Sequence, residues 1–368
     1  MQVTVLQENL QKALSFVGKG ISPKTQLPIL SNILIEAKNG RLILSSTNLE
    51  TTTSFWIGGS VEKEGALTVP ARFFQEIVAT LSNDKVTLKS IEATLHLSCG
   101  ASEVTLAGIG AEEFPPLPHV GDKEVLTLNK SLFETDLPLV AIGASNDESR
   151  PLLTGIKFAK KDAEMELVAT DGYRLACKNS PALKGLDKEF VISARTLVEV
   201  KQMIIEEKSD AVGVFFDKEH NQVTFILPHI QVSARLIEGD YPPYEKIIPK
   251  SYTTQVIFDK AELLKAVKLA SVYAKESANI IRFVVSSGKV VVSANSPQIG
   301  ENKTTVAARV EGEGGEVAFN ARFLLDILGV FKEEELVFEM GGPLSPGVFR
   351  LPKDESYIHI IMPVRVQS

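Results

Sequence analysis

ALTVPARFFQEIVATL, at residues 66–81, is a stretch that this chain contains in three versions. It returns as EFVISARTLVEVKQMI at 189–204 and as EVAFNARFLLDILGVF at 316–331. In each version a short apolar strand leads into Ala-Arg, and a helix follows with an acidic residue four positions after the Arg. The interval between versions is about 125 residues, which indicates a repeat of whole domains.

Three further blocks recur in the same order. An alternating strand that runs into an Asn or Asp turn occurs at 41–50, 165–174 and 289–298, with Asn48, Asp171 and Asn295 as the turn residues. An amphipathic helix opens each copy, at 6–18, 128–143 and 258–274. Pro-Pro linkers close the first two copies, within 110–118 and 238–249. We therefore expect an α+β fold of three tandem domains, 1–120, 121–250 and 251–368, each ordered helix, strands, helix, strands.

Length and composition fit this organisation. The chain has 368 residues, 44% hydrophobic and 23% charged, which is ample for self-sufficient cores. Domains of this size do not need their neighbours to bury a core, unlike solenoid repeats, and domains joined with a constant rotation can close as a ring. The two cysteines form no CxxC pair, the first residues lack a signal-peptide pattern, and no apolar run approaches a membrane span. A soluble, cytoplasmic protein is the expectation.

Several segments carry a family resemblance over the whole length. They are LPILSNILI at 27–35, TVPARFF at 68–74, VATDGYRLA at 168–176, EGDYPPY at 238–244, FNARFLLDIL at 319–328 and YIHIIMPVRV at 357–366. The chain resembles the bacterial DNA polymerase III beta subunit family, the DNA sliding clamps. The resemblance implies a head-to-tail homodimer, a ring with helices lining the hole and sheets outside. Such a ring encircles duplex DNA without sequence preference. It is loaded by an ATP-driven clamp loader and tethers DNA polymerase III subunits and repair proteins through short linear motifs.

Catalytic signatures are absent from the sequence. The five histidines, at 96, 119, 220, 229 and 359, form no HxxxH or HxH pair and stand near no cysteine at metal-ligand spacing. The Gly-Lys at 18–19 lacks the earlier glycine of a phosphate-binding loop. We therefore expect a non-enzymatic protein with no catalytic residue, no metal and no cofactor.

The net charge of −7 argues against a protein that grips DNA, because neutralising phosphates requires Lys and Arg. It leaves open a protein that surrounds DNA with a basic lining. Around the axis of the helix predicted at 258–274, extended by one residue, Lys265, Lys268 and Lys275 fall within about 80° of one another, away from the apolar face. The resemblance adds loop positions, so the candidate DNA-facing residues are Lys24, Arg72, Arg150, Arg195, Lys265, Lys268 and Lys275.

The resemblance also implies a groove, between the second and third domains, that receives an extended peptide. Such a groove needs apolar walls with a few polar groups at the rim, and Met adapts to several partners. The matching positions are Leu153, Thr170, Gly172, Tyr173, Arg174, Leu175, Pro242, Lys246, Ile247, Asn320, Phe323, Leu344, Ile360, Met362, Pro363, Val364 and Arg365. Tyr173 stands where the family often has His, and Lys246 where it often has Arg, so the preferred motif stays open.

The family's subunit interface corresponds to Val104, Val272 and Tyr273. Two other readings stay open. An enzyme on a repeated scaffold would need a cluster of acid, base or nucleophile assembled from distant residues. A cytosolic peptide-binding adaptor without DNA linkage is compatible with the net charge of −7. A hole lined by Lys and Arg would discriminate against the adaptor.

Overall fold

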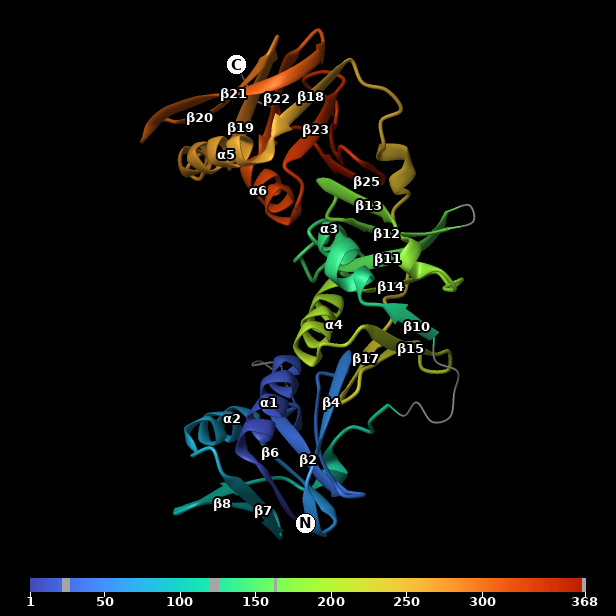
Figure 1. Ribbon diagram of the computed structural model, residues 1–368, viewed down its shortest axis with the longest axis vertical. Coiled ribbons are helices and arrows are strands. Elements are labelled where there is room, and N and C mark those ends of the chain that lie inside the picture. Colours follow the sequence, from blue (N-terminus) through green and yellow to red (C-terminus); the bar gives the residue numbers. More distant parts are fainter. Residues whose placement is uncertain (22–26, 119–125, 162–163, 366–368) are drawn as a thin grey trace. The chain divides into compact units, whose positions relative to one another are not determined.

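The computed structural model describes residues 1–21, 27–118, 126–161 and 164–365. The chain forms two compact units (Figure 1). Unit 1 comprises Met1–Lys130 and Glu199–Leu236, and unit 2 comprises Ser131–Val198 and Ile237–Ser368. Helix α4, Ala194–Glu207, contains the point of division.

Unit 1 contains two antiparallel sheets. The first has the order β5-β1-β7-β8-β9, with bounds Ser60–Lys63, Gln2–Leu6, Lys85–Ile91, Thr94–Cys99 and Ser102–Ala107. The second has the order β10-β15-β16-β17-β4-β3-β2-β6, with bounds Leu126–Asn129, Ala211–Asp217, Gln222–Ile226, Ile230–Arg235, Thr51–Gly58, Arg41–Thr47, Asn32–Lys38 and Gly65–Pro70. Helices α1, Gln7–Val17, and α2, Ala71–Thr80, pack against each other, and α1 also packs on β3 and β4.

The amphipathic pattern of α1 explains how it docks. Leu10, Leu14 and Val17 recur at the spacing of one helix face and are buried. Phe16 is also buried, and its ring stacks on that of Phe55 in β4 with centroids 5.5 Å apart. Burying aromatic and aliphatic side chains of this size contributes roughly 1.5–3 kcal/mol each, which fixes the helix on the sheet.

Unit 2 contains a sheet of twelve strands. Its order is β14-β11-β12-β13-β25-β24-β23-β18-β21-β20-β19-β22. The bounds, in that order, are Phe190–Ser193, Gly155–Lys161, Glu164–Thr170, Arg174–Asn179, Asp354–Ile361, Gly347–Leu351, Glu335–Met340, Thr254–Asp259, Gly300–Gly312, Lys289–Ser296, Ile280–Ser286 and Gly315–Asn320. The helices are α3, Leu137–Ala141, α5, Lys260–Ala274, and α6, Ala321–Val330.

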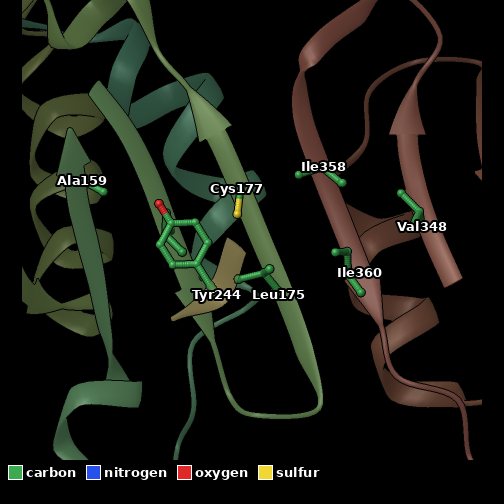
Figure 2. Packing of buried hydrophobic residues seen from close by; sticks show 8 residues of the cluster. Ala159, Leu175, Cys177, Tyr244, Val348, Ile358 and Ile360 are labelled. Atoms are coloured by element: carbon green, nitrogen blue, oxygen red, sulfur yellow. The ribbon is translucent and has the colours of Figure 1, made fainter. Parts of the chain in front are cut away.

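Two buried clusters hold unit 2 together. In one, Phe319 meets Phe338 edge to face, with centroids 5.8 Å apart at 86°. The other joins the middle of the chain to its end. Figure 2 shows Leu175 and Cys177 on one strand and Ile358 and Ile360 on another, with the ring of Tyr244 beside them. The strands are β13 and β25, which are hydrogen-bonded neighbours.

The three-fold repeat is confirmed in the structure. The second helix of each copy begins at the Ala of Ala-Arg, at Ala71, Ala194 and Ala321. A short strand, β1, β10 or β18, precedes the first helix of each copy, which the periodicity alone did not indicate. The helix expected at 128–143 is interrupted, because β10 ends at Asn129 and a π-helical turn, Leu132–Asp136, precedes α3. The third turn begins after Ser296, because Asn295 still pairs within β20.

Across the described residues, no helix is both long enough and apolar enough to cross a membrane. In the same part of the chain, no group of three or more His, Cys, Asp or Glu is placed to hold a metal ion. Cys99 and Cys177 are both buried and free.

Candidate functional site

The loop between β12 and β13 carries the most tightly organised of the predicted site residues. The Asp171 carboxylate accepts hydrogen bonds from the backbone N–H groups of Tyr173, at 2.8 Å, and Arg174, at 2.9 Å. Thr170 Oγ1 donates to the Arg174 carbonyl at 2.6 Å and accepts from the Gly172 N–H at 3.1 Å. Gly172 has φ +90°, which side-chain-bearing residues rarely adopt. This turn leaves Tyr173 61% exposed.

Arg174 ties this loop to α6. Its Nε lies 3.1 Å from Asp171 Oδ2, and its Nη1 lies 2.6 Å from Asp326 Oδ2. The guanidinium carbon also lies 4.4 Å from the centroid of the Phe323 ring, a cation–π contact. Because Arg174 is only 9% exposed, its charge is committed to these partners. Arg174 therefore holds the loop and the Phe323 ring in position.

The end of the chain is held beside the same loop. After β25, the Met362 N–H donates to the Tyr173 carbonyl at 2.8 Å, and the Val364 N–H donates to the Ala318 carbonyl at 2.8 Å. Asn320 caps α6 by accepting from the Arg322 N–H at 2.9 Å. The predicted apolar residues that are exposed, as an apolar binding surface requires, are Tyr173, Ile247, Leu344 and Met362.

A cavity of about 520 Å³ opens next to Met362. We call it the linker cavity, and its lining is Lys246, Ile247, Ile248, Pro249, Lys250, Ser251, Tyr252, Glu339, Met340, Gly341, Ser345, Pro346, Val348, Arg350 and Met362. Three predicted residues, Lys246, Ile247 and Met362, are among them. The sequence did not single out the rest as a site, although it marked 238–249 as a linker.

Other predicted groove residues have different surroundings. Leu175 and Ile360 are buried in the cluster of Figure 2, so they support the surface from below. Leu153, Pro242, Phe323, Pro363 and Val364 are half-buried, while Gly172 and Arg365 are exposed. Thr170 is buried and serves the turn described above.

A buried carboxylate lies beneath the linker. Glu166 is 2% exposed, and it accepts a hydrogen bond from Tyr244 Oη at 3.0 Å and pairs with Lys161 Nζ at 3.1 Å. Burial, together with this carboxylate, raises the pKa of Tyr244. Burial likewise raises the pKa of the Cys177 thiol, so the thiol stays protonated. The group is a structural anchor for the linker at Tyr244.

Three of the seven predicted DNA-facing cations have carboxylate partners among the described residues. Arg72 Nε lies 2.9 Å from Glu76, Arg150 Nε lies 3.4 Å from Asp147, and Lys265 Nζ lies 2.7 Å from Glu262. Arg195, Lys268 and Lys275 are exposed. Lys24 lies outside the described residues.

Lys12 and Lys19, which share one side of the first helical segment, are also paired. Lys12 Nζ lies 2.6 Å from Glu207, and Lys19 Nζ lies 3.8 Å from Glu206. The Glu207 carboxylate also meets His229 Nδ1 at 2.7 Å, and these hydrogen bonds hold its pKa below the usual range despite burial.

The predicted interface residues lie at the edge of a sheet and at the end of a helix. Val104 is in the middle of β9, the last strand of its sheet. Val272, 53% exposed, and the half-buried Tyr273 lie in the last turn of α5. Exposed apolar groups in such places are typical of contact surfaces.

Comparison with known proteins covers nearly the whole chain. Family models of the DNA polymerase III beta subunit match residues 1–118 with the N-terminal domain, 127–243 with the central domain and 245–365 with the C-terminal domain. The beta sliding clamp of Synechococcus elongatus is 29% identical, with 100% of each chain covered.

Solved structures agree. The DNA polymerase sliding clamp of Bacillus subtilis has a TM-score of 0.92 at 26% identity, covering 100% of both chains. A sliding clamp from Bartonella birtlesii, solved bound to griselimycin, has a TM-score of 0.92 at 27% identity, again covering 100% of both chains.

Proposed function

The chain belongs to the bacterial DNA polymerase III beta subunit family, the sliding clamps, and we propose that two copies close into a ring that encircles duplex DNA and tethers replication and repair proteins. The proposed domains are 1–120, 121–250 and 251–368. In this role the protein is a non-catalytic processivity factor of the cytoplasm, without metal or cofactor.

One observation carries the ring: the same strand pairing occurs at two successive junctions of the repeat. β4, which follows the turn at Asn48 in the first copy, pairs with β17, the last strand of the second copy. β13, which follows the turn at Asp171, pairs with β25, the last strand of the third copy. In the third copy β21 corresponds to β4 and β13, and in the first copy β9 is the last strand. If the same pairing occurs a third time, β21 of one chain pairs with β9 of another chain.

The strands that would pair between two chains, β9 and β21, both have an unpaired edge within the described part of the chain. β9 is the terminal strand of its sheet. Residues 300–307 of β21 pair with β20 on one side only, within the described part of the chain. Unpaired edges of this kind readily add a strand from another chain. Two chains joined twice in this manner give a closed ring of six repeats, a head-to-tail arrangement.

Sedimentation velocity tests the pairing. A dimer of 40.1 kDa chains is expected, and Val104→Asp is expected to give monomers because it places a charge in the new sheet. Val198→Asp, at an exposed valine of α4, is the matched control and is expected to leave the dimer intact. A wild-type protein that stays monomeric throughout the micromolar range would refute the ring.

Topological linkage to DNA is tested by retention on plasmid. After loading by a matched clamp loader with ATP, the protein is expected to remain on nicked circles and to be lost from the same plasmid once linearised. The candidate DNA-facing cations, Arg72, Arg150, Arg195, Lys265, Lys268 and Lys275, then supply diffuse phosphate attraction without base contacts. Equal retention on both forms would mean that the protein binds DNA directly and does not encircle it. Retention on neither form would favour the peptide-binding adaptor.

The proposed partner site is the surface around Tyr173, Phe323 and Met362 together with the adjoining rim of the linker cavity. Its exposed apolar side chains and its fixed backbone suit an extended peptide segment. Because Arg174 braces both the loop and Phe323, the surface is preorganised, which lowers the entropy cost of binding.

A further inference from the structure

The linker cavity extends past the residues assigned to the peptide groove. Its lining also includes Pro249–Tyr252, which begin at the last residue of the predicted linker, and Glu339 and Arg350 of the neighbouring strands β23 and β24. Apolar side chains complete the lining: Met340 is buried and Tyr252 is 50% exposed. The cavity is therefore a continuation of the groove, and Lys246 is the one charged residue of its lining that was among the predicted groove positions.

The charges that line this cavity are unbalanced. Glu339 is 7% exposed, and its carboxylate already receives Arg350 Nε at 3.1 Å and Gln255 Nε2 at 3.2 Å. Lys246 and Lys250 line the same cavity, both exposed, and neither has an ion-pair partner among the described residues. Three cations against one carboxylate leave two positive charges in excess, in a chain whose net charge is −7.

We propose that the linker cavity receives the side-chain carboxylate of an Asp or Glu that flanks the apolar anchors of a partner peptide, with Lys250 and Lys246 as its counter-charges. The proposal rests on the peptide groove proposed above and names the chemistry of its partners. An acidic residue is the complement of this lining, because Glu339 is satisfied and the lysines are not. The shared residue Met362 makes the groove and the cavity continuous, so one extended segment reaches both.

A peptide carboxylate fits the surroundings for two further reasons. The apolar walls lower the local dielectric, which strengthens attraction between a carboxylate and an ammonium group. The two lysines are separate, flexible point charges, which suit a single carboxylate without demanding a fixed fork geometry. Exposed pairs of this type typically contribute about 0.2–1 kcal/mol, so we expect each lysine to change affinity by about 1.4- to fivefold.

The test uses fluorescence anisotropy with the full-length protein and synthetic peptides. One labelled peptide carries two apolar anchors, Leu and Phe, with a Gln on either side of them. Two other peptides replace one flanking Gln with Glu, either before or after the anchors. Each is made with a free C-terminus and with an amidated C-terminus. The variants are Lys250→Glu, Lys246→Glu and, as a matched control at an exposed lysine of unit 1, Lys218→Glu. Circular dichroism checks that each variant is folded.

The expected result is that one of the two Glu peptides binds the wild-type protein more tightly than the all-Gln peptide. Lys250→Glu should remove or reverse this preference, and Lys218→Glu should keep it. Equal binding of all peptides, with no effect of Lys250→Glu, would overturn the acidic subsite and leave the groove intact. If peptides with a free C-terminus bind more tightly than amidated peptides whether or not they contain Glu, the cavity binds a terminal carboxylate. That result would also overturn the proposal. If the all-Gln peptide itself does not bind, the proposed groove fails.

Discussion

His359 lies in the middle of β25 with its ring wholly buried, and this makes the pairing of β25 with β13 sensitive to acid. The single proton of Tyr357 Oη is donated to the Leu139 carbonyl at 3.0 Å. His359 Nδ1, 3.1 Å from the same oxygen, is therefore the donor in that contact. His359 Nε2 then carries a lone pair, and it has no hydrogen-bond partner within the described chain.

Burial, assisted by the nearby charge of Arg174, lowers the pKa of His359 from 6.5 to about 3. Well above pH 6.5 the ring is neutral in both folded and opened states, so it does not affect stability. Below pH 6.5 the opened state binds a proton that the folded state cannot bind, and stability falls as the pH falls toward 3. At pH 5, one and a half pH units below the opened-state value, this ring alone removes about 2 kcal/mol.

Native-state amide hydrogen exchange of β25 measures this directly, because protection reports the free energy of opening that strand. The opening free energy of β25 should fall between pH 7 and pH 5 in the wild-type protein. In His359→Gln this fall should be smaller by about 2 kcal/mol. Gln cannot titrate and can still donate to Tyr357. His96→Gln, at a half-buried histidine of β8, is the control and should leave the loss unchanged. Identical pH dependence of wild type and His359→Gln would refute the reasoning.

Four other substitutions test how unit 2 is held together. Arg174→Ala should lower the opening free energy of β13 by about 2–3 kcal/mol in the same exchange experiment, because it removes two ion pairs and a ring contact. Asp326→Ala should cost less than about 1 kcal/mol, because that carboxylate is 44% exposed. Tyr244→Phe should lower stability to urea by about 1–3 kcal/mol, because a buried carboxylate loses its hydroxyl partner. Gly312→Ala should lower the melting temperature, because φ is +106° and the added Cβ would lie 2.1 Å from a backbone carbonyl oxygen.

The parts of the fold that were predictable from sequence are those set by local patterns. The starts of α2, α4 and α6 follow from an apolar strand, Ala-Arg and a helical apolar period, all within 16 residues of sequence such as 66–81. The turn at Asp171 is likewise local, because an aspartate bonds to the backbone two and three positions further on. The short strands before each first helix were missed, because four to six residues carry too little periodicity beside a longer helix.

The candidate site was only partly predictable, because its defining contacts join distant residues. Arg174 and Asp326 are 152 positions apart, and no sequence pattern around either residue indicates that they pair. The linker cavity needs Lys250 and Arg350 to line the same space, although they are far apart in the sequence. The buried place of His359 follows from the pairing of β13 with β25, and no pattern in the tail indicates that pairing.

The distribution of charge favours a protein that encircles DNA over one that binds DNA tightly through its phosphates. A protein that grips DNA gains affinity by releasing counterions from phosphates, and each cation that already has a carboxylate partner gives up part of that gain. Arg72, Arg150 and Lys265 all have such partners, and so do Lys12 and Lys19. Apart from Lys12, whose partner Glu207 is buried, these cations pair with exposed carboxylates that water and salt screen, so the pairs weaken attraction to phosphate without contributing much to stability. A ring held by topology needs no tight grip, and weak attraction lets it slide.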